Sequence, residues 1–320
     1  MTSRRLLGLL FVGLLVIGSA LWFAGRQPDR ASTVGDPVLP DLKASLNAIK
    51  EIRLTRGDGS AVTLKRHANH WEVAQRGYRA DSGKIRKLLL DLAALTVRAE
   101  KTADPSNYSR IGVEAADSAT AKSTAVEALT ADRNWKILIG KQDSPRAGFV
   151  RVPDQRVSQL AEPLITIDLD PKHWLDRSLL DIPATAIRSV TVVPAEGPAY
   201  TAARDRTGQA DMVLVDLPKH AKLAAPDAAN AATAALANLT FDDVQERDAI
   251  AKGATSRATY TFFDGRSLTI AGRRDAGQTY VAIVAASDTE LTERTKGWEF
   301  ELPGWKFDQL FKPRAELLAK

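Results

Sequence analysis

The sequence predicts an α+β protein in which an N-terminal transmembrane helix is followed by two tandem repeats of a mostly antiparallel sheet, each with one main packed helix. Three observations support this fold class. The chain starts with a long uncharged apolar run, it then shows short runs of alternating polarity around tight turns, and the order of these elements is repeated. About 280 residues follow the apolar run and the polar spacer after it, which is enough for two hydrophobic cores.

The apolar run is expected to anchor the protein in a membrane. Arg4 and Arg5 precede the uncharged segment Leu6–Ala24, which closes with Trp22 and Phe23. At about 1.5 Å per residue, a helix of this length matches a hydrocarbon core roughly 30 Å thick. Aromatic residues at its end suit the boundary with the lipid headgroups. Residues 1–25 are therefore predicted to be the anchor, flanked by these four residues.

A cleaved secretory signal is the alternative interpretation of this segment. Ser19-Ala20 and Ala24-Gly25 are small enough for cleavage, but no clear A-x-A triplet is present. The apolar run also exceeds the usual signal core of about 7 to 15 residues, which favours an uncleaved anchor. The chain contains no cysteine, so a lipoprotein anchor, a disulfide and a thiolate metal site are excluded.

The basic residues around the segment predict its orientation. Arg4 and Arg5 stand before it, and Arg26 and Arg30 follow it. The short, wholly basic tail and the α-amino group favour an N-terminus inside the cell. We therefore expect a single-pass protein of the inner membrane with a periplasmic C-terminal domain. Residues 26–45 are expected to form a linker because they are polar and rich in proline.

The first repeat is predicted to cover residues 46–181. Alternating polarity indicates two strands, at 51–55 and 61–65, around the turn residues Gly57-Asp58-Gly59. Further strands are expected at 70–74, 135–139 and 148–152. A helix is expected to begin at Asp81-Ser82, because the apolar positions that follow recur at helical spacing. These positions are Ile85, Leu88, Leu89, Leu92 and Leu95.

The second repeat, residues 182–320, shows the same order of elements. Strands are expected at 189–193, 199–203 and 212–215, then around Asp264-Gly265, ending at Ile270, and at 280–284. The expected helix opens at Pro226-Asp227 and runs to Leu239. It is rich in alanine, so it should lie closer to its sheet and bury less apolar area. Leu92 and Leu236 should occupy equivalent core positions.

Several short motifs resemble a bacterial family known only as a domain of unknown function. The motifs are Tyr108-Ser-Arg-Ile-Gly112, Leu138-Ile-Gly140, Val150-Arg-Val152, Leu175-Asp-Arg-Ser-Leu-Leu180 and Ile187-Arg-Ser-Val190. The resemblance covers about residues 49–285, with a looser match at 297–303. Its members have one N-terminal span and a repeated α+β region, and they often accompany gliding-motility-type ABC transporter components.

This resemblance implies a membrane-tethered, non-enzymatic accessory protein of an ABC-type transport system. Such a protein would act outside the cytoplasm through contacts with proteins or substrate, and the membrane components of the transporter would be its partners. The alternative is a module that binds envelope polysaccharide or lipid in a cleft between the repeats, with a hydrolase as a third, more distant reading. A polar pocket would favour binding, and a flat apolar patch would favour a partner.

The residues with reactive side chains predict no catalytic, cofactor or metal site. The formal net charge is only +5, and its basic residues are mixed with acidic ones, so nucleic-acid binding is not expected. His67 and His70 form an H-x-x-H motif, but residues three apart on one strand point to opposite faces. Trp298 and Trp305 flank Pro303-Gly304, and we expect them to contribute to a partner surface.

Overall fold

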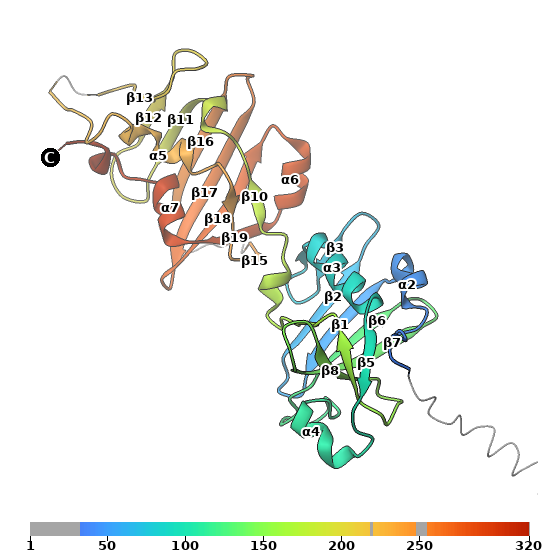
Figure 1. Cartoon of the computed structure of the whole chain (residues 1–320). Helices are drawn as coiled ribbons and strands as arrows, with labels where there is room; N and C mark the ends of the chain where they lie inside the picture. Colours follow the sequence, from blue (N-terminus) through green and yellow to red (C-terminus); the bar gives the residue numbers. More distant parts are fainter. Residues whose placement is uncertain (1–32, 218–219, 248–254, 320) are drawn as a thin grey trace, which may run out of the picture. The chain divides into compact units, whose positions relative to one another are not determined.

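A computed structural model describes residues 33–217, 220–247 and 255–319, and these residues form two compact units. The first unit contains the described residues up to Asn69 together with Gly83–Asp170. The second unit contains Pro171–Lys320 and also the earlier segment His70–Ser82. Figure 1 shows both units as sheets with short helices. The repeats were expected at 46–181 and 182–320, whereas the structure groups residues 70–82 and 171–181 with the second unit.

The elements of the first unit are, in chain order, α2 (Leu42–Ser45), the 3-10 helix η1 (Leu46–Ala48), β1 (Glu51–Arg56), β2 (Ala61–Arg66), α3 (Ser82–Ala93), β5 (Thr96–Glu100), η2 (Pro105–Asn107), α4 (Tyr108–Ile111), β6 (Thr124–Leu129), β7 (Asn134–Gln142), β8 (Gly148–Arg151) and β9 (Gln159–Glu162).

The second unit begins with the hairpin β3 (Trp71–Val73) and β4 (Tyr78–Arg79). Its later elements are η3 (Pro171–Trp174), β10 (Ser178–Leu180), η4 (Ala184–Ala186), β11 (Ile187–Val193), β12 (Tyr200–Ala203), β13 (Val213–Leu214), η5 (Ala228–Asn230), α5 (Ala231–Ala234), β14 (Leu239–Thr240), β15 (Asp243–Glu246), β16 (Thr255–Phe262), β17 (Ser267–Asp275), β18 (Gln278–Ala286), α6 (Thr289–Thr295), β19 (Trp298–Leu302), α7 (Gly304–Leu310) and η6 (Arg314–Leu317).

The main sheets of the two units have the same strand order. In the first unit, neighbouring strands follow the order β2-β1-β6-β7-β8-β9-β5, and in the second unit they follow β12-β11-β16-β17-β18-β19-β15. The second sheet continues past β12 to β13. Each pairing within these two runs is antiparallel. In both units, a strand that comes after the helical stretch, β5 or β15, lies at the far edge of the sheet beside the last strand, β9 or β19.

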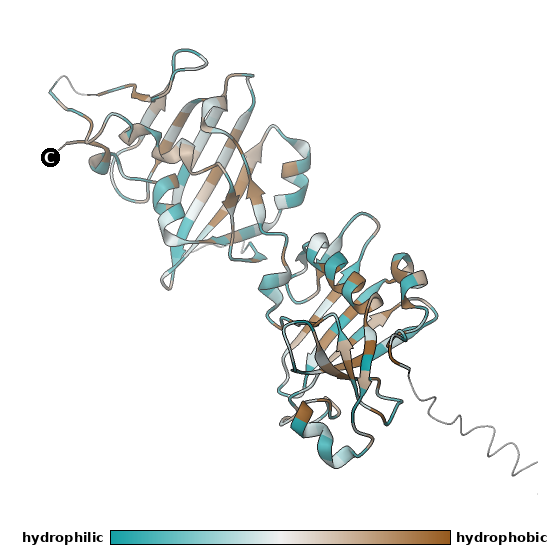
Figure 2. Ribbon diagram, in the orientation of Figure 1, coloured by the Kyte–Doolittle hydropathy of each residue, from teal (hydrophilic) through white to brown (hydrophobic). Residues whose placement is uncertain are grey.

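Alternating burial explains why these segments form half-buried strands. Along β16 and β17, buried and more exposed residues alternate. Figure 2 shows the hydropathy of the residues, with brown bands between pale and teal ones along the strands of the sheets. Successive side chains of a strand point to opposite faces, so one face of each sheet lines a core. Tyr260, Ile270, Leu54 and Leu64 are among the side chains that are almost wholly buried there.

The predicted helix of the first unit is confirmed. α3 covers Ser82–Ala93, and the apolar positions at helical spacing, from Ile85 to Leu92, are buried, as is Leu95 just after the helix. Leu92 and Leu236 are at most 1% exposed. Both leucines therefore contribute to a core.

The predicted α+β class is wrong in its helical part, because the protein consists mostly of antiparallel sheets with a few short helices. The helix expected from Pro226 to Leu239 is replaced by the three-residue η5, the four-residue α5 and the start of β14. This stretch offers many alanines and only one large apolar residue before Leu239, so a long helix here would bury little apolar area.

The expected transmembrane helix and inner-membrane localisation also need correction. Among the residues that the structure describes, no helix is long and apolar enough to cross a membrane. The segment expected to do so, with its flanking residues Arg4, Arg5, Trp22 and Phe23, lies outside the described residues. The single-pass, signal-anchor and periplasmic assignments are therefore withdrawn.

Three of the motifs that carry the family resemblance pack together in the first unit. Gly112 ends α4 with a left-handed backbone (φ 71°), which glycine adopts without strain. Gly140 of β7 lies directly beneath this turn, where a Cβ atom would stand 2.5 Å from the carbonyl oxygen of Ile111. Only glycine permits this close approach.

Arg151 of β8 packs against the same turn. Its side chain is buried, its guanidinium lies 4.4 Å from the ring centroid of Tyr108, and its Nε donates to the carbonyl of Val113 at 2.9 Å. The Tyr108 hydroxyl in turn donates to the carbonyl of Arg156. All these groups bond to backbone or to each other, which indicates that these motifs stabilise the fold.

Candidate binding cleft of the second unit

The second unit contains an open polar cleft of about 670 Å³, which we call the hairpin cleft. Its volume is in the range of small-molecule sites, roughly 300 to 1,000 Å³. The turn of the β3–β4 hairpin forms one wall, and the strands β15, β18 and β19 form the other. The lining residues are Ala74, Gln75, Arg76, Gly77, Asp243, Val244, Gln245, Glu246, Gln278, Tyr280 and Glu301.

Aromatic packing holds the hairpin against the rest of the second unit. Tyr78 of β4 is buried, and its ring meets Phe241, Trp298 and Phe300 edge-on at centroid distances of 5.8, 5.3 and 5.6 Å. Edge-to-face pairs of this kind add about 0.5 to 1.5 kcal/mol beyond their buried area. Burial also raises the pKa of Tyr78 to about 12. The cleft wall is thus rigidly placed, although it comes from a distant part of the chain.

A bidentate ion pair joins the two walls. Arg76 donates from Nε and Nη2 to the two carboxylate oxygens of Asp243, at 2.7 and 2.8 Å. Burial alone would raise the pKa of Asp243, but hydrogen bonds from Arg76 and from the Val244 N–H outweigh it and lower that pKa. Asp243 therefore stays ionised and neutralises the one basic side chain of the cleft lining.

Hydrogen bonds also fix the polar side chains on β18 and β19. The Tyr280 hydroxyl donates to Gln278 Oε1 at 2.6 Å, and the Gln278 amide donates to Glu301 at 3.1 Å. Burial is the main cause that raises the pKa of Tyr280, with Glu301 adding to it. The phenol therefore remains a neutral donor, and the amide and carboxylate present acceptors to the cleft.

A buried ion pair supports this surface from behind. The guanidinium of Arg273 lies 4.7 Å from the ring centroid of Tyr280 and donates to Glu299 from both Nε, at 3.1 Å, and Nη2. The two side chains of this ion pair are only 11% and 4% exposed. The hydrogen bonds from Arg273 to Glu299 are the main cause that raises the pKa of the arginine. Gln245, from the cleft lining, donates to the same carboxylate.

The cleft lining carries an excess of negative charge. Arg76 is offset by Asp243, and Glu246 and Glu301 remain as two further carboxylates. An anionic ligand would be repelled there, and the polar lining offers little surface to an acyl chain. The amide, phenol and carboxylate groups match a neutral ligand that carries many hydroxyl groups, because a hydroxyl both donates and accepts.

A second cavity of about 580 Å³ lies elsewhere in the same unit. It is lined by segments 178–183 and 286–294 and by the turn between β16 and β17. Arg294 spans part of it and donates to the backbone carbonyl of Leu179 at 2.6 Å. The Arg294 guanidinium is therefore hydrogen-bonded to the backbone. Arg266, also in the lining, forms an ion pair with Asp264 at 2.7 Å. The lining of the hairpin cleft is the more polar of the two.

The two tryptophans predicted to contribute to a partner surface differ in environment. Trp298, at the start of β19, is half-buried against Tyr78. Trp305, in α7, is 60% exposed, and the ammonium of Lys306 lies 5.0 Å from its ring centroid. The partner surface stays a prediction. Trp298 contributes to the support of the hairpin cleft.

The sequence did not reveal the cleft residues as a site. They come from segments 74–77, 243–246, 278–280 and 301, which are separated by long stretches of chain. The available signal was the cluster Gln75-Arg76-Gly77 after a strand, with the acidic pair Asp242-Asp243 far downstream. Only the fold brings these segments together, so the pattern alone could not identify the site.

A family model described as a domain of unknown function, DUF4340, matches residues 71–262. This range covers more than half of the chain, so the protein belongs to that family. No curated protein and no solved structure matches the sequence.

Proposed function

We propose that this member of the DUF4340 family is a non-enzymatic protein that binds a neutral saccharide in the hairpin cleft. The observation that carries this proposal is the combination of a 670 Å³ volume with fixed amide, phenol and carboxylate groups on its walls. A sugar hydroxyl can donate to Glu246 or Glu301 and accept from Gln278, which is the pairing that these side chains favour. Preorganised groups lose little conformational entropy when a ligand binds.

The charge of the cleft separates this proposal from the lipid alternative. Glu246 and Glu301 would repel a phosphate headgroup, and no basic side chain of the lining is left to hold one after Arg76 pairs with Asp243. A saccharide needs no counter-charge. The polar cleft therefore supports the sugar-binding alternative.

We propose a wider role as an accessory protein of an ABC-type transport system, with the transporter's membrane components as partners. The resemblance to a family that often accompanies such transporters supports this role. In this setting, the protein would contact the transported substrate or the transporter without performing chemistry on either. Co-purification of the full chain with the membrane components of an ABC-type transporter from the same cells tests this role separately from ligand binding.

The binding proposal is tested by titrating the full chain with neutral and anionic oligosaccharides and following heat release or NMR shifts. We expect neutral sugars to bind and sulfated or phosphorylated analogues to bind at least about tenfold more weakly. Changing Gln278→Ala removes one hydrogen-bonding amide, which is worth about 0.5 to 1.5 kcal/mol, or roughly two- to tenfold in affinity. Glu301→Gln should also weaken binding.

Glu290→Ala is the matched control, because Glu290 is an exposed acid in the lining of the other cavity. It should leave the affinity unchanged. The proposal fails if no neutral saccharide binds, or if Gln278→Ala and Glu290→Ala have the same effect.

A further inference from the structure

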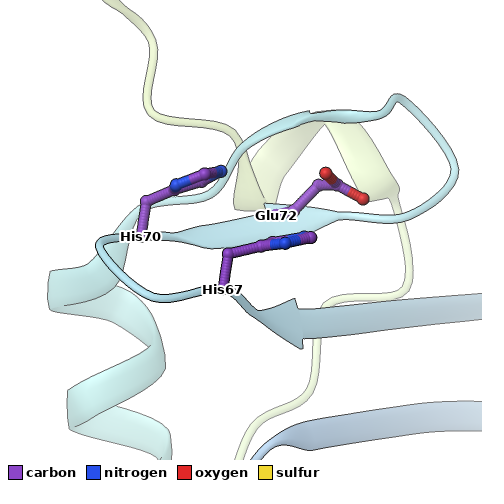
Figure 3. A group of neighbouring side chains, drawn as sticks. All are labelled: His67, His70 and Glu72. Atoms are coloured by element: carbon purple, nitrogen blue, oxygen red, sulfur yellow. The ribbon is translucent and has the colours of Figure 1, made fainter.

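His67, His70 and Glu72 bring their metal-binding atoms together at the start of the β3 strand. One ligand atom from each residue lies within 4.8 Å of the other two. Figure 3 shows the two imidazole rings and the carboxylate extending to the same side of the chain, with Glu72 on β3 and His67 just after β2. All three lie within the run His67–Glu72, so a single turn of the chain creates the arrangement.

The local backbone explains why the H-x-x-H motif converges here. Residues 67–70 lie outside the strands, in the bend between Arg66 and Trp71, so the alternation of a strand does not apply to them. His70 directly precedes β3 and Glu72 lies within it, and ligand atoms of these two residues lie within 4.8 Å of each other. The bend then turns His67 back toward them.

We propose that these three residues bind a first-row transition metal ion, with Zn²⁺ as the best match. Two imidazole nitrogens and one carboxylate oxygen form a ligand set that zinc uses in proteins, with a water molecule or another ligand completing the tetrahedron. Mg²⁺ and Ca²⁺ prefer all-oxygen sites, so this set discriminates against them. The site is separate from the hairpin cleft and does not depend on the saccharide proposal.

The geometry needs only a small adjustment to hold the ion. At metal–ligand distances of about 2.0 to 2.2 Å, two ligands of a tetrahedral site stand roughly 3.4 Å apart. The observed atoms lie within 4.8 Å. His67 is exposed and His70 and Glu72 are half-buried, so rotation of the outer imidazole can close the difference. The exposure of His67 also gives the ion access from solvent.

The test is Zn²⁺ binding to the full chain, measured by competition with a chromophoric chelator. We expect one ion per chain and at least about tenfold weaker binding in each of His67→Ala, His70→Ala and Glu72→Gln, since even loss of an outer-shell partner costs about 10- to 100-fold. His220→Ala is the matched control, because it removes an exposed histidine elsewhere in the chain and should change nothing. Excess Mg²⁺ or Ca²⁺ should not compete.

Cu²⁺ provides a readout of the ligands themselves. Electron paramagnetic resonance of the Cu²⁺-loaded chain should show hyperfine coupling to two imidazole nitrogens, and each histidine variant should lose one of them. Urea unfolding of the metal-free variants checks that they remain folded. The inference is overturned if His67→Ala/His70→Ala binds Zn²⁺ as tightly as the unchanged chain, if His220→Ala has the same effect, or if Mg²⁺ competes equally.

Discussion

The two units share a strand order but cover their sheets differently. In the first unit, the 12-residue helix α3 contributes four buried apolar side chains. At the corresponding place in the second unit, the chain forms only the four-residue α5, and the seven-residue α7 contacts both α5 and β18. The antiparallel pairing therefore defines this architecture, and the helical cover varies between the units.

The fourth strand in each of the two strand orders, β7 or β17, contains a glycine that lies against the segment packed over it. Gly140 of β7 is overlain by backbone, whereas Gly272 of β17 is overlain by the rings of Phe311 and Phe307. A Cβ atom would stand 2.5 Å from Ile111 O in the first case and 2.3 Å from Phe311 Cε2 in the second. In both sheets, the missing side chain of the glycine leaves room for another part of the chain. Backbone occupies this room in the first unit, and phenylalanine rings occupy it in the second.

The largest expected effect concerns the aromatic core of the second unit. Phe241→Ala removes a fully buried ring whose centroid lies 5.0 Å from that of Phe300 and which also packs on Tyr78. We expect the free energy of unfolding to fall by about 3 to 5 kcal/mol, measured by urea denaturation. Because the hairpin cleft rests on this cluster, ligand affinity should fall as well. An effect below 1 kcal/mol would show that the hairpin is not held by these rings.

The next prediction compares the two core leucines directly. Leu92→Ala should lower the free energy of unfolding by about 2 to 5 kcal/mol, because the helix around it cannot collapse into the cavity that the substitution leaves. Leu236→Ala should cost an amount in the lower part of that range, since it has small alanine neighbours. The measurement is urea unfolding of both variants, with the exposed Leu90→Ala as control. If both substitutions lowered the free energy of unfolding by the same small amount, this prediction would be wrong.

The two glycines give a finer test. Gly140→Ala should cost about 1 to 3 kcal/mol, because the new methyl group meets backbone that cannot move aside. Gly272→Ala meets side-chain rings instead, so combining it with Phe311→Leu should recover part of the loss. Thermal unfolding of the single and double variants measures this coupling. Gly304→Ala has open space around its Cβ position and serves as control.

The smallest effect is a pH dependence at the cleft. The pKa of Asp243 is lower in the folded state, so its ion pair with Arg76 stabilises the protein above the unfolded pKa of about 3.9. This contribution is lost as the pH falls through the folded value. Asp243→Asn should therefore lower the free energy of unfolding by about 1 kcal/mol at neutral pH, and this difference should shrink as the pH falls below about 3.9. A constant difference between the two proteins from pH 7 to pH 3 would contradict it.

The sequence predicted the elements whose pattern is local. The spacing of Ile85, Leu88 and Leu92 predicted α3, and the alternation at Glu51–Thr55 predicted β1, because periodicity within one element needs no tertiary information. It did not predict β6 (Thr124–Leu129). The helix expected after Pro226 failed because alanine content alone supplies propensity without a buried face.

The candidate sites were less predictable than the fold. The hairpin cleft depends on Tyr78 reaching Phe241 and Phe300, contacts that no local pattern contains. The histidine cluster is local, yet it was missed because His67 was treated as part of a strand, whereas the chain bends there. In both cases the deciding information is the path of the backbone.

The contribution of residues 70–82 to the second unit affects how the protein is made on the ribosome. Tyr78 emerges more than 160 residues before its partner Phe241, a delay on the order of ten seconds at ordinary rates of translation. During this interval the segment cannot complete its aromatic contacts and needs protection from other nascent chains. A gene split after Asp170 should likewise yield a downstream fragment that stays insoluble until the upstream fragment is co-expressed.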